Sequence, residues 1–214
     1  LVLDASDGSE LWRFDTTDEP EGDLTPSGGA WSAPAIDAEG YVYYGTGNGY
    51  YSHNAPAEHQ NERLYTNSAL KLDAATGELD WFFQAVPNDF WDWDLQLSPI
   101  LADVEGRPMA IVGGKMGFVY GLDSETGELL WKTSVGTHNG HDDDGQAQLD
   151  GTLELPPTPF DVFPGTLGGV ETNMAYRDGI VYAAVVNMSS LVASDEDLSN
   201  PVPPTDTSEG TGTI

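Results

Sequence analysis

The stretch Lys71–Trp81 reads KLDAATGELDW, and two other segments of the chain repeat it without a gap. They are Val2–Trp12, VLDASDGSELW, and Gly121–Trp131, GLDSETGELLW. The shared pattern is LD-x-x-[TD]-G-x-x-x-W, and its tryptophans lie 69 and 50 residues apart. A motif that returns at such intervals indicates one supersecondary unit that is copied along the chain and packed against its neighbours.

Each unit is predicted to be a β-hairpin. The run before the aspartate, FVYGLD in the third copy, alternates apolar and polar residues as a strand does. Gly8, Gly77 and Gly127 then supply the positive φ angle that a tight turn requires, and a short return strand carries the tryptophan. One hairpin cannot bury both of its faces. Copies must therefore pack on one another, and a large flat indole is suited to lie between neighbouring sheets.

The remainder of the chain adds strands and no long helical period. With 214 residues, 39% of them hydrophobic, the chain can form a substantial core. Short strands at this spacing predict an all-β radial array, a β-propeller of about three to four blades, with GTGTI at the end as the opening strand of a fourth. We treat residues 1–214 as one partial propeller domain. The other expected strands are Ala33–Asp37, Tyr41–Gly45, Leu97–Asp103, Met109–Gly113, Met174–Arg177 and Ile180–Val186.

The charge of the chain is strongly acidic. It has 36 acidic and 7 basic residues, a net charge of −29, which argues against binding to nucleic acid or to an anionic membrane. The acid is spread along the whole chain, which favours a salt-adapted, haloarchaeal source over an acidic interaction tail. The absence of cysteine excludes disulfides and thiolate sites from this stretch. There is no apolar run long enough for a membrane-spanning helix.

Both ends of the sequence are abrupt. The chain opens inside a strand-like run, LVLDA, and closes on GTGTI. We therefore expect a piece of a longer protein, which would be inactive without the missing blades.

An unusual mixture of acids and aromatic residues occupies Val86–Ser98, VPNDFWDWDLQLS. Two interpretations are open. The stretch could be a turn at a sheet edge with exposed acids, or it could hold a carboxylate in an aromatic cleft where the carboxylate accepts a proton.

The repeats resemble the tryptophan-docking motif of the eight-bladed quinoprotein propellers, which are the alcohol dehydrogenases dependent on pyrroloquinoline quinone (PQQ). Non-catalytic propellers carry similar repeats. Longer segments are similar to the polyvinyl-alcohol dehydrogenase-like branch of the family, and together they cover most of the chain from Gly28 to Asn187. They are GGAWSAPAID, NDFWDWD, GGKMGFVYGLD and GGVETNMAYRDGIVYAAVVN.

The resemblance implies roles for individual residues. In GGAWS, Trp31 would be the ring on which the quinone stacks, the alternative being a core tryptophan. In PNDFWD, Asp92 would be the catalytic base. In GKMGFVYGLD, Lys115 would bind the quinone oxygens at a position where most alcohol dehydrogenases have arginine.

The same resemblance implies a metal ion beside the quinone. In YGTGN, Asn48 would coordinate it through its amide oxygen, which suits Ca²⁺, although a glycine-rich turn also favours asparagine. Asp92 would be a further ligand. Asp94 stands two residues later, the spacing of lanthanide-using members, so a lanthanide is possible; the alternative is an outward-facing acid. The family's metal-binding glutamate would precede Leu1.

The leading functional hypothesis is an enzyme fragment that oxidises alcohols or sugars by hydride transfer to PQQ. The electron acceptor is unknown, and we expect an extracellular or cell-envelope location. The alternatives are a non-catalytic propeller that acts as an envelope scaffold and a ligand-binding domain without turnover. Two histidine-containing stretches, Tyr50–His59 and Thr137–Gly145, are interpreted as solvated loops rather than metal sites.

Overall fold

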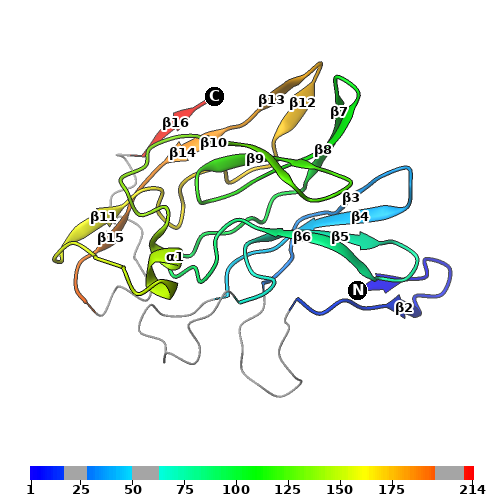
Figure 1. Cartoon of the computed structure of the whole chain (residues 1–214), viewed down its shortest axis with the longest axis horizontal. Coiled ribbons are helices and arrows are strands. Elements are labelled where there is room, and N and C mark those ends of the chain that lie inside the picture. Colours follow the sequence, from blue (N-terminus) through cyan, green and yellow to red (C-terminus); the bar gives the residue numbers. More distant parts are fainter. Residues whose placement is uncertain (17–27, 50–62, 196–209) are drawn as a thin grey trace.

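The computed structural model describes residues 1–16, 28–49, 63–195 and 210–214, and nearly all of its regular structure is β-strand (Figure 1). The stretch Tyr50–His59 lies outside these residues. The strands are β1 (Val2–Leu3), β2 (Glu10–Trp12), β3 (Ala35–Ile36), β4 (Tyr41–Gly45), β5 (Ser68–Asp73), β6 (Leu79–Gln84), β7 (Ile100–Val104), β8 (Arg107–Gly113), β9 (Phe118–Asp123), β10 (Leu129–Ser134), β11 (Phe160–Val162), β12 (Ala175–Arg177), β13 (Ile180–Tyr182), β14 (Val185–Asn187), β15 (Ser190–Val192) and β16 (Thr211–Thr213), with one short helix, α1 (Asp144–Leu149).

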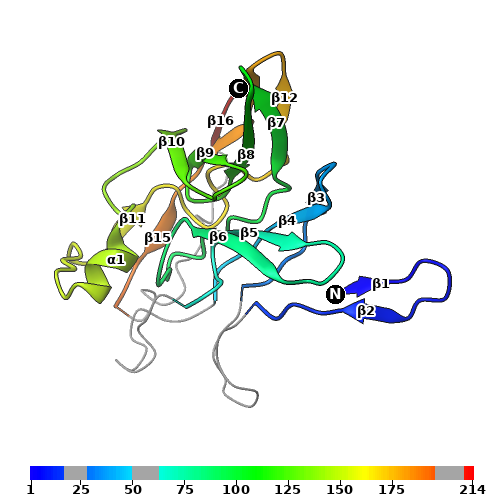
Figure 2. The same cartoon turned by 45° about the vertical axis from the view of Figure 1, so that its right-hand side comes forward.

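Two four-stranded antiparallel sheets form the centre of the molecule (Figures 1 and 2). One has the order β3-β4-β5-β6 and the other β10-β9-β8-β7. In each sheet the strands follow one another along the chain, so each sheet is a meander of the kind that makes a propeller blade. Each meander ends with one of the repeated hairpins, β5–β6 and β9–β10, as the sequence predicts.

Shorter pieces stand on both sides of these two sheets. The hairpin β1–β2 precedes them, and the pairs β12–β13 and β14–β16 follow them. Strand β3 contacts β7, and β7 contacts β12, so consecutive sheets lie side by side. The prediction of an all-β partial propeller with about three to four blades is confirmed by this arrangement together with the similar structures reported below.

Two of the three repeated tryptophans, Trp12 and Trp81, contact the next repeat, whereas Trp131 is 36% exposed. Trp12 donates from Nε1 to the carbonyl of Ala74 at 2.9 Å, in the turn of the next repeat. Trp81 donates to the carbonyl of Ser124 at 3.1 Å in the same way. A Cβ on Gly127 would lie less than 3 Å from the Trp81 ring, and Gly127 has a φ of +75°. Glycine is therefore required there both for the turn and for the approach of the indole.

The boundaries of some strands differ from the expected ones. The strand expected at Leu97–Asp103 begins at Ile100, because Pro99 cannot donate to a sheet ladder. The strand expected at Ile180–Val186 is divided into β13 and β14, which pair with different partners. The stretch Thr137–Gly145, expected as a solvated loop, includes the first two residues of α1. The six-residue helix is too short to show an apolar period.

The interpretation of Thr137–Gly145 as a solvated loop is wrong for its second half. His141 and Asp144 are buried, their side chains meet at 2.8 Å, and the His141 ring packs on Phe160. Asp144 also accepts a hydrogen bond from Nε1 of Trp91 at 3.0 Å. Within the described part of the chain, no group of three or more histidine, cysteine, aspartate or glutamate side chains is placed to hold a metal ion. The loop is therefore packed against the core through Trp91.

The contact between His138 and Asp142 allows the packing of this loop to be tested through the pH dependence of stability. Its Nδ1 lies 2.7 Å from Asp142, and this hydrogen bond raises the pKa of His138. Since the folded pKa is raised, the stabilisation is present below about pH 6.5 and is lost as the pH rises through the folded value. We expect His138→Gln to lower stability by about 0.5–1 kcal/mol more at pH 5.5 than at pH 8.5, measured by thermal unfolding. Asp142→Asn should show the same difference between the two pH values, and a pH-independent loss in both variants would contradict this account.

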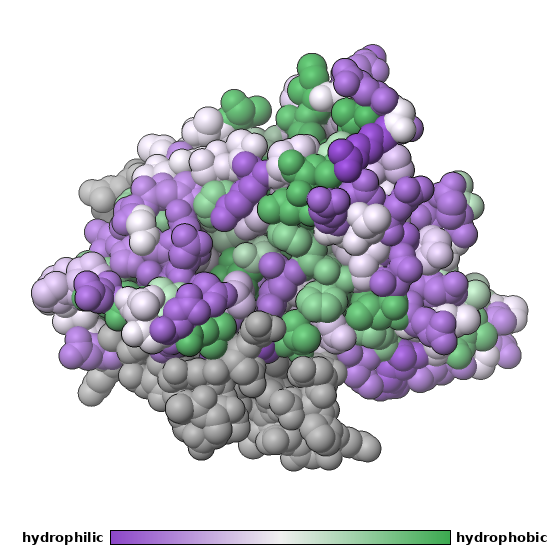
Figure 3. Space-filling view, viewed as in Figure 1, coloured by the Kyte–Doolittle hydropathy of each residue, from purple (hydrophilic) through white to green (hydrophobic). Residues whose placement is uncertain are grey.

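Hydrophilic residues cover much of the surface, and a cluster of aromatic and aliphatic residues forms the core. On the face drawn in Figure 3, hydrophilic residues are spread over the surface rather than gathered in one patch. Trp91 and Trp93 are almost completely buried in the main core cluster, together with Phe90, Leu95 and Tyr120. No helix in the described residues is long and apolar enough to cross a membrane.

Candidate functional site

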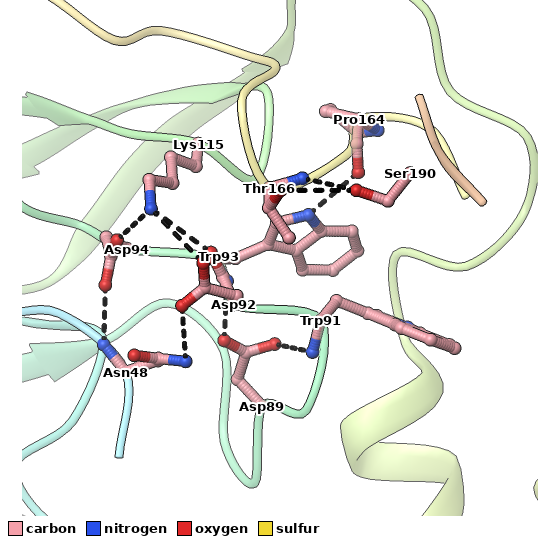
Figure 4. Close-up of polar contacts among 10 residues, drawn as sticks. All are labelled: Asn48, Asp89, Trp91, Asp92, Trp93, Asp94, Lys115, Pro164, Thr166 and Ser190. Atoms are coloured by element: carbon pink, nitrogen blue, oxygen red, sulfur yellow. Dashed lines mark hydrogen bonds and ion pairs between the residues drawn. The ribbon is translucent and has the colours of Figure 1, made fainter. Parts of the chain in front are cut away.

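The segment between β6 and β7 sends its aromatic and acidic side chains in different directions. The indoles of Trp91 and Trp93 enter the core, and Trp93 donates from Nε1 to the carbonyl of Pro164 at 2.9 Å. Asp92 has a φ of +61°, so the segment turns at this residue instead of running as a strand. The carboxylates of Asp92 and Asp94 nevertheless approach the same lysine (Figure 4).

That lysine is Lys115, in the tight connection between β8 and β9. Its backbone N–H donates to the carbonyl of Asp94 at 3.0 Å, so the connection lies directly on the acidic segment. Its Nζ lies 2.6 Å from Oδ2 of Asp94 and 3.6 Å from Oδ2 of Asp92. A Cβ on the preceding Gly114 would clash with the backbone of Asp94. The glycine therefore permits the close approach that brings the ammonium group to both acids.

Asn48 joins this group from the end of β4. Its backbone N–H donates to Oδ1 of Asp94 at 2.8 Å, and its Nδ2 donates to Oδ1 of Asp92 at 3.2 Å. The side chain is buried, and among the described residues its Oδ1 has no hydrogen-bond partner. A buried amide oxygen without a partner is costly unless a ligand completes its coordination.

Trp31 lies beside Asn48 and is not a core residue. It is 55% exposed. Its ring lies against Gly47, where an added Cβ would be about 2.4 Å from the indole and 2.3 Å from Oδ1 of Asp94. Gly47 therefore allows the ring to lie close to the acidic group while much of the indole remains accessible.

Glu171 is a charged neighbour that the sequence did not single out, although it occurs in the segment GGVETNMAYRDG. The two residues before it pack on the lysine connection: Val170 N–H donates to the Gly114 carbonyl at 3.1 Å, and a Cβ on Gly169 would clash with the Lys115 carbonyl. Glu171 interacts electrostatically with Lys115 and both aspartates, and its Oε1 is buried without a hydrogen-bond partner among the described residues. The only sequence signal for Glu171 was the resemblance of this segment to the polyvinyl-alcohol dehydrogenase-like branch.

The fold brings together the five residues singled out in the sequence, and these come from four separate connections between strands. Comparison with known proteins gives the context. The family model for the PQQ-type glucose/ethanol/alcohol dehydrogenase β-propeller domain matches residues 2–145. This chain belongs to that PQQ-type propeller family. The match ends before Glu171 and includes the five predicted residues, Trp31, Asn48, Asp92, Asp94 and Lys115.

Individual relatives of this PQQ-type propeller agree with the family match. The quinohemoprotein alcohol dehydrogenase of Comamonas testosteroni is 30% identical over 199 residues, which is 86% of this chain and 28% of the relative. The polyvinylalcohol dehydrogenase of a Pseudomonas species is 30% identical over 165 residues, 63% of this chain and 25% of the relative. The structure of the quinohemoprotein alcohol dehydrogenase ADHIIG from Pseudomonas putida HK5 superposes with a TM-score of 0.69 and 26% identity, covering 88% of this chain and 33% of that one. The chain thus spans about a quarter to a third of the length of these relatives.

The group of residues around Lys115 carries more negative than positive charge. Three carboxylates, those of Asp92, Asp94 and Glu171, surround the single ammonium group of Lys115. Burial raises the pKa of Asp92; the charge of Lys115 opposes this shift, and that of Asp94 adds to it. Burial also raises the pKa of Glu171. For Lys115, burial acts to lower the pKa, but the hydrogen bond and charge of Asp94 outweigh it and raise the value. A bound cation would reduce this excess of negative charge.

The lysine should be important for stability when no metal is added. Asp94 is only 1% exposed, and removing its counter-charge would leave a buried carboxylate uncompensated. We expect Lys115→Met to lower the free energy of unfolding by about 3 kcal/mol, and Lys115→Arg, which keeps the charge, to lower it much less. Urea unfolding with a chelator present measures both. Equal losses in the two variants would show that packing of the side chain, and not its charge, matters.

Proposed function

We propose that this chain forms part of the active site of a PQQ- and metal-dependent dehydrogenase that oxidises alcohols or sugars. The observation that carries the proposal is the meeting of Asn48, Asp92, Asp94 and Lys115 at one place, with the buried Oδ1 of Asn48 left without a partner. An oxygen-rich group of this kind fits a hard cation. Family membership supports the same reading.

The residues present fit both expected groups. Trp31 would hold the flat quinone against its exposed indole, and Lys115 would pair with the quinone oxygens. Oδ1 of Asn48 and the carboxylate of Asp92 would bind the metal ion. Both oxygens of Asp94 are engaged, one by Asn48 N–H and one by Lys115. Pairing of Lys115 with the quinone would release Oδ2 of Asp94, which could then support Ca²⁺ or a lanthanide.

When bound, PQQ supplies the acceptor for a hydride from the substrate carbon. Asp92 accepts the hydroxyl proton at a carboxylate oxygen, and its side chain is 29% exposed, which leaves it accessible to a substrate. Asn48 and Lys115 hold this carboxylate from two sides and so orient it. The buried indoles of Trp91 and Trp93 occupy the space behind the segment, where they exclude water.

We also infer a cell-envelope or extracellular location. We infer a small alcohol or sugar substrate and leave the electron acceptor open, since no residue of the chain indicates one. The chain spans about a quarter of its relatives' length, so further blades would complete the cofactor site.

Reconstitution tests the proposal. The full-length enzyme, prepared in high salt, would receive PQQ with Ca²⁺ or with La³⁺, and dye-linked oxidation of a panel of alcohols and sugars would be followed. The expected result is oxidation that requires both PQQ and a metal ion. No oxidation, combined with no quenching of tryptophan fluorescence by PQQ, would reject the proposal in favour of a scaffold.

Metal binding can be measured separately from turnover. Tb³⁺ emission sensitised by the nearby tryptophans reports occupancy, and Ca²⁺ or La³⁺ competes for the same site. Asn48→Ala should lower the affinity of the site for all three ions by about tenfold or more. The matched control Asn139→Ala, at an exposed asparagine, should leave the affinity unchanged. Asp94→Asn should lower the affinity for La³⁺ more than the affinity for Ca²⁺, because a trivalent ion loses more attraction when one negative charge is removed. An equal loss of affinity for both ions would show that Asp94 is not a metal ligand.

A further inference from the structure

We propose that Asp89 is a positioning residue for Asp92: its carboxylate fixes the backbone on both sides of the base and so sets where the base lies. The inference rests on the proposed function of Asp92. Asp89 stands three residues before Asp92 in VPNDFWDWD and contributes no atom to the group around Lys115.

The geometry is a bridge across one residue. Oδ1 of Asp89 accepts the backbone N–H of Trp91 at 2.8 Å, and Oδ2 accepts the backbone N–H of Trp93 at 2.8 Å. Asp92 is the residue between these two amides (Figure 4). One carboxylate therefore holds the Phe90–Trp91 peptide unit, one residue before the base, and the Asp92–Trp93 peptide unit, which directly follows the base.

The backbone of Asp92 needs such support. Its φ of +61° is in the left-handed region, which non-glycine residues enter at a cost of about 1–2 kcal/mol. The conformation persists only where the surroundings stabilise it. The two buried indoles anchor Trp91 and Trp93 at their side chains, through Asp144 and Pro164, and Asp89 anchors the same residues at their backbones.

The burial of Asp89 is otherwise hard to account for. The residue is 2% exposed, and its carboxylate has no ion-pair partner among the described residues; the Arg63 guanidinium donates to its backbone carbonyl at 3.3 Å. Burial raises the pKa of Asp89 to about 7, and the hydrogen bonds from the Trp91 amide, the Asn67 side chain and the Trp93 amide oppose this shift. A carboxyl group is kept in this unfavourable environment where its two oxygens bind two diverging amides, which an amide side chain with one oxygen cannot do.

The position of the base should control rate more than binding. A misplacement of about 1 Å at a reacting group can lower a rate by about 10²-fold. We expect Asp89→Asn, which loses one of the two acceptor oxygens, to lower kcat of the full-length enzyme by about 10- to 100-fold. The substrate KM and the Kd of PQQ, measured by fluorescence quenching, should stay within about twofold of the wild-type values.

A double-mutant cycle with Asp92→Asn separates positioning from general destabilisation. Once the base is absent, its position no longer matters, so Asp89→Asn should change the residual rate by less than about threefold in that background. Asp161→Asn is the control: it removes the charge of an exposed carboxylate in β11, away from the Trp91–Trp93 segment. Its kcat should remain within about twofold of the wild-type value.

The outcomes are distinct. An unchanged kcat in folded Asp89→Asn, or an equal loss with and without the base, overturns the positioning role. Should Asp89→Asn fail to fold, Asp89→Glu, which keeps both oxygens on a side chain one methylene longer, replaces it with the same expectations and the same tests. If Asp92→Asn retains full activity, Asp92 is not the base and the role of Asp89 fails with it, although the dehydrogenase function stands. If the wild-type enzyme shows no PQQ-dependent oxidation, the proposed function itself fails.

Discussion

Asp92→Asn is expected to lower kcat for alcohol oxidation by about 10²–10⁴-fold, the range in which general base catalysis contributes. An amide cannot accept the hydroxyl proton, yet it has nearly the same shape as the carboxylate. Its oxygen can still accept from Nδ2 of Asn48, so the segment should keep its conformation. The measurement is steady-state kinetics of the PQQ- and metal-loaded enzyme.

The control for this variant removes one carboxylate elsewhere. Asp161→Asn changes an exposed residue of β11 whose side chain makes no contact with the site, and it should keep kcat within about twofold of the wild-type value. PQQ quenching of tryptophan fluorescence shows whether the cofactor still binds in Asp92→Asn. Full cofactor binding with a lost rate supports the base. A rate that stays within threefold of the wild-type value would assign the proton transfer to another group.

Trp81→Ala is expected to lower the free energy of unfolding by about 3–5 kcal/mol, the range observed when a large buried aromatic side chain is truncated. The indole is only 8% exposed, packs against the glycine turn at Gly127, and donates to the carbonyl of Ser124 in the neighbouring sheet. Its removal leaves a cavity between two blades and takes away one of the two hydrogen bonds that the Ser124 carbonyl accepts, the other coming from the Tyr43 hydroxyl at 3.3 Å. Denaturant unfolding followed by circular dichroism measures the loss.

Phe82 is a matched control on the same strand. It is the next residue of β6, points to the opposite face, and is 40% exposed. Phe82→Ala loses an edge contact with Tyr65 and should cost about 1 kcal/mol. Comparable losses in the two variants would mean that the stability of the sheet does not depend on the contact between blades.

Much of the fold could be predicted because its signals are local. The alternation in FVYGLD, the Thr-Gly turns and the repeated tryptophan depend on neighbouring residues, and β9, β10 and the turn glycines lie where they were expected. The predicted boundaries of helices and strands were wrong where the local sequence signal was weak. The helix α1 is too short to show a period, and β7 begins only after Pro99.

The candidate site was predictable only through family resemblance. Asn48, Asp92 and Lys115 are far apart in the sequence, and no spacing rule brings them together. Neither the pairing of Lys115 with Asp94 nor the unpartnered Oδ1 of Asn48 could be inferred from the sequence. Glu171 and Asp89 were missed because their importance depends on what surrounds them: Glu171 lies near a lysine from another sheet, and Asp89 bonds two amides of a turn.

By itself the sequence determined the repeated hairpin, the all-β class and the excess of negative charge, since each follows from residue type and short-range order. The tertiary structure alone decided what the acids and indoles of VPNDFWDWDLQLS do. The turn at Asp92 places Trp91 and Trp93 in the core and directs Asp92 and Asp94 to Lys115. Burial, hydrogen bonding and the pKa of a carboxyl group are properties of its surroundings, and these surroundings come from strands that meet only after the chain has folded.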